Sequence, residues 1–555
     1  MTILTTSIDV LLEQLTECLD KNTPLASELY DAISQKPEYG IDVMSLLPKT
    51  ESSSDDTEDT ASLEPSPQLM ASLHFIEICL VQVKLAQEQF QRWADELLTR
   101  YQTTLLSLIE QYPDNACWLA VINLFFDAEL TVTEEIKEKY LEVMSQSQGD
   151  DEAQEHQQVI VEQLLSDNSD ATDFEIAELF LSQTNALPQD YFPSFLKELL
   201  TFNMPKATNS AILFLLHPTM EIRDTIIQHA GAIFEDIILP GESMSRLLMI
   251  RHWLPEVEKG AIELLINEQR KKSAPFADLR QAEIREIHAT EMDGTGAQAI
   301  FLLVKRKKGF QAAGLLVKRY YGIKDTWLSP IMSKAEAKNY AKDSVYGDFF
   351  VKKIDQNYLD TLIADHIHQA QKIDAVPHLN LLELQEITGS QWQAQPIQIE
   401  QTIEQLLVEH PVIDAAYQKK SFARSDNWYR KYKFTESWYD ESPELDRLVN
   451  QFCTFVDGIK QCHVSNALPT IIEQYFEARR EQWLEHFLWL ALWAKPSARH
   501  NEYLWKDALV VTCALFNNQP MMELPIIRVI AEHSILQSVE TMENRKTHLG
   551  SIRPY

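Results

Sequence analysis

Apolar residues along most of this chain are spaced as in amphipathic helices. Near the amino terminus, Leu11, Leu15 and Leu19 continue a series that begins at Ile8 and includes Leu12. Intervals of three and four place such side chains on one face of a helix. We therefore expect one or two short helices within residues 1–47. The same spacing returns over 68–272 and again over 396–555.

The region 68–272 is expected to be a succession of helices joined by short polar segments. A long helix is predicted over 69–112, where Pro113 and Asn115 then provide a stop and a new cap. Shorter helices are predicted over 115–127, 133–145, 155–166, 173–182 and 188–202. Successive helices of this length are typical of stacked helical hairpins, so we predict an irregular α-solenoid over 68–272.

One segment of this region, residues 212–230, resembles a HEAT repeat. The resemblance rests on Pro218, on the pair Ile222-Arg223, and on the apolar residues that follow, Ile226, Ile227 and Ala230. In the HEAT family the proline begins the second helix of a repeat, and the Ile-Arg pair faces the core and the neighbouring repeat. The resemblance implies HEAT-like helical hairpins, although no second copy of the pattern is evident.

The pattern changes at residue 280. Six of the fourteen glycines lie between Gly294 and Gly347, and apolar stretches of strand length cover 284–293, 297–304 and 310–317. Asp-Gly and Lys-Gly turns separate them, which is typical of hairpins. We predict a small α+β module over 280–375 with a three-stranded antiparallel meander. Helices over 334–342 and 356–371 are expected to cover one side of it.

Helical spacing resumes in the carboxy-terminal part of the chain. Helices are predicted over 397–410, 443–459, 468–495 and 501–516. Five of the eleven tryptophans lie between Trp428 and Trp493, and rings of this size favour a well-buried core. We therefore predict an aromatic-rich helical domain over 396–555. The expected fold class is mainly α, with a small antiparallel β module and a carboxy-terminal helical domain.

The segment 48–67 differs from the rest of the chain in being polar, acidic and closed by two prolines. Such a segment cannot bury enough apolar area to offset the entropy of the chain. We predict that it is a disordered linker.

Composition supports a helical chain with an acidic amino-terminal third. Glycine accounts for 14 of 555 residues, about 2.5% against roughly 7% in average proteins, and glycine is costly inside helices. The net charge is −34, and residues 1–200 contribute 38 acidic and 9 basic residues to it. An acidic surface repels nucleic acid and membranes, and it favours solubility or a basic partner.

The cysteines and the terminal segments suggest a cytoplasmic protein. The six cysteines form no CxxC pair, so free, buried thiols in a reducing compartment are expected. The amino terminus lacks the basic flank and the apolar stretch of a signal peptide. The most apolar carboxy-terminal stretch, 487–493, is far shorter than the ~20 residues that span a bilayer. We expect no contact with a membrane.

Two motifs could indicate a catalytic or metal site. Residues 293–296, Asp-Gly-Thr-Gly, resemble the phosphate-binding hairpin of the actin and sugar-kinase superfamily, where glycine admits a phosphate and the aspartate organises a metal. A type I′ hairpin turn explains the same four residues. His366 and His368 are two apart on a predicted helix, so they point away from each other and are expected at the surface. We predict no catalytic residue, no metal site and no cofactor.

Two basic stretches stand out against the acidic background. The first is Lys305, Arg306, Lys307 and Lys308 at the predicted hairpin tip. These cations can bind phosphates, or they can protect a sheet edge from pairing.

The second basic stretch, residues 419–439, alternates cations with aromatic rings. Aromatic faces for stacking and cations for phosphates are the chemistry of single-stranded nucleic-acid binding. An aromatic helix and loop packed on the tryptophan-rich domain, with its cations in water, is the other interpretation. The candidate binding residues are Arg424, Trp428, Tyr429, Arg430, Lys431 and Lys433.

Three functional hypotheses follow from the sequence. The first is a non-enzymatic intracellular scaffold or adaptor that binds a protein partner. The second is a single-stranded nucleic-acid-associated protein that uses residues 419–439 and the 305–308 cations. The third is an enzyme with an unrecognised phosphate-handling site at Asp293.

Overall fold

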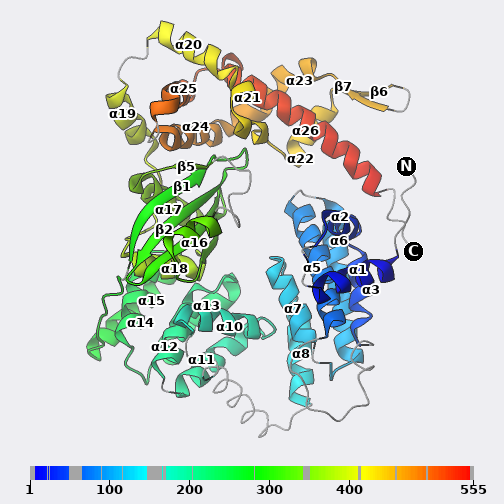
Figure 1. Cartoon of the computed structure of the whole chain (residues 1–555), viewed down its shortest axis with the longest axis vertical. Coiled ribbons are helices and arrows are strands. Elements are labelled where there is room, and N and C mark those ends of the chain that lie inside the picture. Colours follow the sequence, from blue (N-terminus) through cyan, green and yellow to red (C-terminus); the bar gives the residue numbers. More distant parts are fainter. Residues whose placement is uncertain are drawn as a thin grey trace. The chain divides into compact units, whose positions relative to one another are not determined.

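The computed structural model describes residues 7–48, 66–146, 166, 171–341 and 351–549, apart from residues 22, 24, 89–90, 116, 203, 281, 411–413, 457–458 and 496–497. The predicted linker over 48–67 lies outside these residues except at its ends, and so does the predicted helix over 155–166 except for Ser166. The fold is mainly α, with a small antiparallel sheet and a carboxy-terminal helical region (Figure 1).

The chain forms two compact units, residues 1–202 and 203–555. The boundary divides the predicted solenoid range of 68–272 between the two units. The described helices of the first unit are α1 (Ile8–Asp20), α2 (Ser27–Ser34), α3 (Tyr39–Met44), α5 (Pro67–Glu88), α6 (Arg92–Gln111), α7 (Trp118–Asp127), α8 (Glu134–Gln146), α10 (Asp173–Thr184), the 3-10 helix η1 (Gln189–Tyr191) and α11 (Phe192–Thr201).

Helix α5 is central to the first unit and packs against α1, α2, α3, α6 and α7. The single long helix predicted over 69–112 is wrong, because the chain breaks between α5 and α6 and the two helices pack against each other. The apolar spacing continues through both because both face the same core. The amino-terminal segment likewise holds three described helices where one or two were expected. By length and composition alone α5 could cross a membrane, and half of its most apolar window is buried inside the structure.

The second unit begins with four α-helices that precede its sheet. They are α12 (Pro205–Leu213), α13 (Met220–Ile233), α14 (Gly241–Ile250) and α15 (Glu256–Lys271), with the 3-10 helix η2 (Phe214–Leu216) between the first two. Ile222 and Arg223 are buried on α13, and α13 packs against η2 and α15. The HEAT resemblance and the solenoid remain predictions.

The sheet has five antiparallel strands in the order β4-β3-β2-β1-β5. Its strands are β1 (Ala282–Thr290), β2 (Ala297–Arg306), β3 (Gly309–Lys318), β4 (Gly322–Leu328) and β5 (Val351–Lys353). The predicted three-stranded meander was therefore incomplete. Strand β4 carries Lys324 and Asp325, so it lacks the apolar run that identified its neighbours, and β5 is too short to show a pattern.

Helices cover both faces of this sheet, so the expected one-sided cover is wrong. Ala337 of α16 (Lys334–Ala341) packs on Leu303 and Ala312, which are paired across β2 and β3. On the opposite face Tyr358 of α17 (Gln356–Gln371) donates a hydrogen bond to Gln298 of β2. Helix α18 (Leu379–Thr388) packs against β1 and β4. Strand β2 is buried at consecutive residues because both faces are covered.

The carboxy-terminal region is mostly helical and is built around the predicted tryptophan core. Its α-helices are α19 (Ile399–Glu409), α20 (Ala415–Ser425), α21 (Trp428–Lys431), α22 (Pro443–Asn450), α23 (Val464–Ile471), α24 (Arg480–Ala494), α25 (Ala498–Phe516) and α26 (Pro525–Leu549). Shorter helical turns are η4 (Lys433–Ser437), η5 (Ile472–Phe476), η6 (Glu477–Arg479) and η8 (Met521–Glu523). All five tryptophans between 428 and 493 are buried, as predicted.

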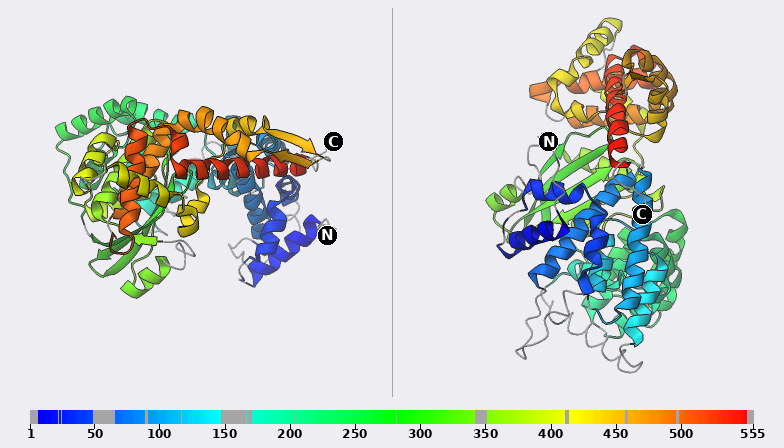
Figure 2. Two further views of the ribbon diagram at one scale, coloured as in Figure 1. Left: turned by 90° about the horizontal axis from the view of Figure 1, so that it is seen from above. Right: turned by 90° about the vertical axis from the view of Figure 1, so that its right-hand side faces the viewer.

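The helix predicted over 443–459 is wrong in its second half. Helix α22 ends at Asn450, and a hairpin of β6 (Cys453–Val456) and β7 (Ile459–Cys462) follows, apart from the five-stranded sheet (Figures 1 and 2). A disulfide joins Cys453 to Cys462 across this hairpin. The expectation that all cysteines are free thiols is therefore wrong for this pair. The predicted helix over 468–495 is also interrupted, by η5 and η6.

Gly40 is required by a close approach in the first unit. A methyl group added there would lie 2.0 Å from the Tyr101 hydroxyl oxygen and 2.9 Å from Cys79 Cβ. Tyr101 is buried, and its hydroxyl donates to the carbonyl of Pro37. Alanine at residue 40 would displace this contact.

We predict that Gly40→Ala destabilises the protein by about 1–3 kcal/mol, the usual cost of overpacking a core. Gly231→Ala is the matched control, because the helical Gly231 has no atom within 4 Å of an added methyl group. That variant should gain about 0.5–1 kcal/mol, since alanine favours helix over glycine. Denaturant unfolding measures both. Equal effects of the two substitutions would contradict the prediction.

Candidate functional site

The first predicted cation cluster lies at the tip of the β2–β3 hairpin. Arg306 pairs with Gly309, which places Lys307 and Lys308 in the connecting turn. Lys305, Lys307 and Lys308 are exposed, whereas Arg306 is half-buried and burial lowers its pKa. The predicted hairpin tip is therefore confirmed, and three of its four cations reach solvent.

The two tryptophans of the second cluster, Trp428 and Trp438, lie inside the protein. Trp428 is 2% exposed and packs against Trp438 and Phe487. Tyr429 donates a hydrogen bond to the Trp438 carbonyl, and its ring lies 4.0 Å from that of His533. The prediction that Trp428 is an exposed stacking residue is therefore wrong, whereas Tyr429 is half-buried. Rings spaced for nucleotide stacking and rings spaced for core packing look alike in a sequence.

The cations of the second cluster have mixed environments. Arg424 forms an ion pair with the buried carboxylate of Asp507, which raises the pKa of Arg424. Arg430, Lys431 and Lys433 are exposed. Of the ten candidate residues, six cations therefore reach solvent: Lys305, Lys307, Lys308, Arg430, Lys431 and Lys433.

These six cations form two separate groups at opposite ends of the sheet. The β1–β2 turn contacts residues 437–439, because Gly294 N–H donates to the Ser437 carbonyl at 3.2 Å. From that turn β2 runs for ten residues to the hairpin tip, which is roughly 30 Å at 3.3 Å per residue. The 305–308 group and the 430–433 group thus do not converge on one site.

The Asp293 motif makes the contacts of a turn. The Asp293 carboxylate accepts hydrogen bonds from the Ala297 N–H at 2.8 Å and from the Thr295 hydroxyl at 2.7 Å. A methyl group on Gly294 would lie 2.4 Å from the Ser437 carbonyl oxygen. The glycine therefore admits the protein's own backbone where the kinase-like motif would admit a phosphate.

The two histidines of α17 do not form a pair. His366 is buried with its Nδ1 bonded to the Leu362 carbonyl, so its predicted surface position is wrong, and His368 is half-buried. His366 is inside because α17 packs against the sheet with that face. Within the described residues no group of three His, Cys, Asp or Glu side chains could hold a metal ion.

A segment after α18, residues 389–398, forms a strap that the sequence did not single out. Trp392 anchors it and is buried. Its N–H donates to Gln385 at 2.9 Å, its indole N–H donates to Asp360 at 2.7 Å, and its carbonyl accepts from Trp253 at 2.8 Å. Three separate elements therefore hold the strap at one residue.

Two hollows flank this strap and share the residues 391–393. The glutamine groove has a volume of about 550 Å³ and is lined by Asp360, Thr361, Ala364, Gln391, Trp392, Gln393, Gln395, Pro396, Ile397, Gln398, Gln401, Thr402 and Gln405. The arginine hollow has a volume of about 570 Å³ and is lined by Ser245, Leu248, Met249, Arg251, His252, Arg270, Phe276, Ala277, Gln385, Gln391, Trp392 and Gln393. Both volumes are in the range of small-ligand sites.

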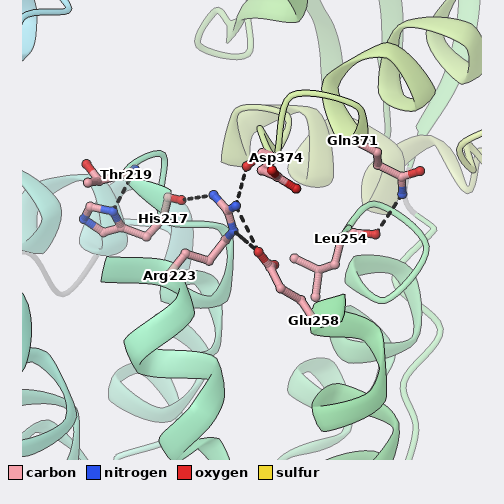
Figure 3. A network of polar contacts seen from close by, with 7 residues as sticks. All are labelled: His217, Thr219, Arg223, Leu254, Glu258, Gln371 and Asp374. Atoms are coloured by element: carbon pink, nitrogen blue, oxygen red, sulfur yellow. Dashed lines mark hydrogen bonds and ion pairs between the residues drawn. The ribbon is translucent and has the colours of Figure 1, made fainter. Parts of the chain in front are cut away.

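A buried ion-pair network fixes the helices beside the arginine hollow. Arg223 is fully buried, and its guanidinium contacts both carboxylate oxygens of Glu258 at 3.0–3.1 Å (Figure 3). It also donates to the carbonyls of His217 and Asp374. These contacts join α13, α15 and the turn after α17. Burial raises the pKa of Glu258, and Arg223 opposes that shift.

The turn that carries Arg251 and His252 is held from α17. Gln371 donates to the carbonyls of His252 at 3.2 Å and Leu254 at 2.8 Å, and the second of these bonds is drawn in Figure 3. Nearby, the buried pair of Arg246 and Glu386, 2.6 Å apart, joins α14 to α18. The walls of the hollow are therefore tied to one another by buried polar contacts.

These residues carry no direct signal in the sequence. The lining of the arginine hollow comes from residues 245–277 and 385–393, which are more than a hundred positions apart. The one local signal is compositional, since glutamine recurs at 391, 393, 395, 398, 401 and 405.

A second buried polar contact lies where the sheet meets α24. Arg319 follows β3, and its guanidinium donates to His486 Nδ1 at 3.1 Å. Burial and this neighbouring charge hold the pKa of His486 well below its usual value. His486 is therefore neutral in the folded protein, which lets its Nδ1 accept the bond.

The chain is similar to two domain families. Residues 188–273 match the Y4lR second domain, and residues 400–539 match the Y4lR C-terminal helical domain. An uncharacterized protein y4lR of Sinorhizobium fredii is 24% identical over 369 residues, which is 63% of this chain and 66% of that relative. The matched part is thus just under two thirds of the relative's length. No solved structure matches the chain.

We predict that Arg223→Met destabilises the protein by about 3–5 kcal/mol, because it leaves the Glu258 carboxylate buried without a counterion. Lys259→Ala on the same helix as Glu258 is the control and should cost about 0–1 kcal/mol, since its partner Glu256 is 87% exposed. The double variant Arg223→Met with Glu258→Leu should recover most of the loss. Denaturant unfolding measures all three, and an equal cost for Arg223→Met and Lys259→Ala would contradict the prediction.

We also predict that His486 makes the protein less stable in acid. The pKa of His486 in the folded protein lies below the usual 6.5. Below pH 6.5 the unfolded chain therefore binds a proton that the folded chain does not, and the free energy of unfolding decreases as the pH is lowered. His486→Gln keeps an acceptor for Arg319 but does not titrate. The slope between pH 6.5 and 5 should become shallower by up to about 1.4 kcal/mol per pH unit.

Measuring unfolding free energy at several pH values tests this prediction. The control is His463→Gln, which replaces an exposed histidine and does not touch the contact of His486 with Arg319. An identical slope in wild type and His486→Gln would refute the assignment.

Proposed function

We propose that this chain is a non-enzymatic scaffold or adaptor that binds a macromolecular partner, and that a segment of a protein partner lies in the glutamine groove. The observation that supports the proposal is a groove wall of exposed glutamine side chains. Several of them lie on the strap, which the hydrogen bonds of Trp392 hold in place. The chain's helices supply the frame that holds this strap in place.

The chemistry of the groove suits a polypeptide backbone. Every glutamine amide has both donor and acceptor groups, and so does every peptide unit of an extended segment. The side-chain amides of five groove glutamines make no hydrogen bond to another described residue, namely Gln391, Gln393, Gln395, Gln401 and Gln405. A partner segment can therefore pair with them without displacing an internal contact.

The strap is also rigid before binding. Besides the three bonds of Trp392, the Gln395 N–H donates to the Ala364 carbonyl and the Ile397 N–H donates to Asp365. A preorganised site loses less conformational entropy when a partner binds. This favours recognition of a segment over a mechanism that needs the strap to refold.

The other two hypotheses have less support. Three of the six exposed cations lie at the hairpin tip, roughly 30 Å along β2 from the turn that contacts Ser437, and Trp428 is buried. Asp293 is engaged by its own turn. A single-stranded nucleic-acid function would rest on the exposed cations and on half-buried rings such as Tyr429. An enzyme function would rest on a carboxylate that already accepts two hydrogen bonds.

We predict that Gln401→Ala with Gln405→Ala weakens partner binding about tenfold or more. The two residues are one turn apart on the groove side of α19, and each lost hydrogen bond costs about 1 kcal/mol. Peptides selected by display on the immobilised full chain serve as defined partners. Fluorescence anisotropy then gives their affinities for wild type and variants.

The matched control is Glu400→Ala with Glu404→Ala, which alters the same turns of α19 outside the groove. This variant should bind the peptides as wild type does. The proposal fails if display yields no binder, or if both double variants bind equally. Salt-dependent binding of a single-stranded oligonucleotide that is lost in Lys307→Glu with Lys308→Glu would replace it with the nucleic-acid hypothesis.

A further inference from the structure

The arginine hollow differs from the glutamine groove in its charge. Its lining contains Arg251, Arg270 and His252 and no aspartate or glutamate. The whole chain has 83 acidic and 49 basic residues. A hollow lined by two arginines without a carboxylate has an electrostatic preference for an anion.

Neither arginine has a carboxylate partner among the described residues. Arg251 makes one side-chain hydrogen bond there, from its Nε to His252 Nε2 at 3.2 Å. The Arg270 guanidinium lies 5.8 Å from the centre of the Phe276 ring. Both guanidinium groups thus keep N–H donors that a ligand can use, and guanidinium forks match phosphate oxygens in pairs.

His252 positions Arg251. Burial lowers the pKa of His252, and the charges of Arg251 and Lys259 lower it further. The neutral ring can therefore accept the Arg251 Nε–H bond. That bond occupies one edge of the guanidinium and leaves its two terminal amino groups available.

The Gln385 side chain adds a hydrogen-bond donor to the wall of the hollow. Gln385 is 3% exposed and lines the hollow. Its Oε1 accepts the Trp392 N–H at 2.9 Å, while its Nε2 donates to no described residue. This amide nitrogen is not among the fully buried atoms that lack a partner, so it is accessible and can donate to an oxygen atom of a bound ligand.

The remaining wall suits a planar ring. Phe276 is 50% exposed, and the exposed amides of Gln391 and Gln393 lie on the strap side. Aromatic side chains stack on the faces of bases, and glutamine amides can pair with the edge of a purine. A volume of about 570 Å³ is within the range of small-ligand sites.

We propose that the arginine hollow binds a phosphate-bearing ligand of nucleotide size, with Arg251 and Arg270 on the phosphates and the Phe276 ring against the planar group. This ligand is separate from the protein segment in the glutamine groove. Because the two hollows share residues 391–393, both ligands would contact the same strap.

Titration calorimetry of the full chain with ADP, pyrophosphate and adenosine tests this proposal. ADP should bind saturably and at least tenfold more tightly than adenosine, with an affinity that falls as salt is raised. Arg270→Ala should weaken ADP binding at least tenfold. Lys271→Ala removes the same charge from the next position of α15, outside the hollow, and should leave ADP binding unchanged.

Further variants test the aromatic wall and the independence of the hollow. Phe276→Ala should weaken ADP binding and leave pyrophosphate binding unchanged, because only ADP has a planar group for the ring, and Asp293→Asn should have no effect. Gln401→Ala with Gln405→Ala should also leave ADP binding intact, so a failure of the adaptor proposal would not affect this one. The absence of saturable ADP binding, or equal losses in Arg270→Ala and Lys271→Ala, would overturn the proposal.

Discussion

The contact of Arg223 with Glu258 is the constraint on which the second unit depends most. A guanidinium with no exposed surface must have its charge met inside the protein, and here one carboxylate and two backbone carbonyls do so. Those partners come from α15, from the turn before α13 and from the turn after α17. One side chain therefore joins α13 and α15, which precede the sheet, to the turn after α17.

Buried arginines also explain why the charge of the second unit is a poor guide to its surface. Arg223, Arg246 and Arg319 are all buried, and the first two form ion pairs inside the fold. Cations used in this way hold elements together and are not available to a nucleic acid. The cations that face the arginine hollow, Arg251 and Arg270, lie where the contacts of the buried ones place them. The buried ion pairs of Arg223 and Arg246 thus hold the helices together, and Arg251 and Arg270 give the hollow its preference for an anion.

Features of this protein that depend on neighbouring residues could be predicted from the sequence, whereas features that depend on contacts between distant residues could not. Leu11 and Leu15 are buried as their spacing predicts, because helix periodicity is a local property. Strand β4 escaped detection because an edge strand with Lys324 and Asp325 has no apolar run. The sequence allows Trp428 to be an exposed stacking residue, because cations flank it. In the structure it lies in the core, where its ring packs against Trp438 and Phe487.

The mainly helical fold, the glycine-rich β module between helical regions and the tryptophan core could all be predicted from the sequence, because periodicity, turn residues and ring size act over a few neighbouring residues. The tertiary structure was needed to show which cations stay exposed, that Gly294 lies against the backbone of Ser437, and that the strap at Trp392 lies between two hollows. Those outcomes depend on contacts between residues that are more than a hundred positions apart, such as Trp253 with Trp392. No local pattern encodes such a pairing, because burial and charge neutralisation are satisfied only when the distant elements meet.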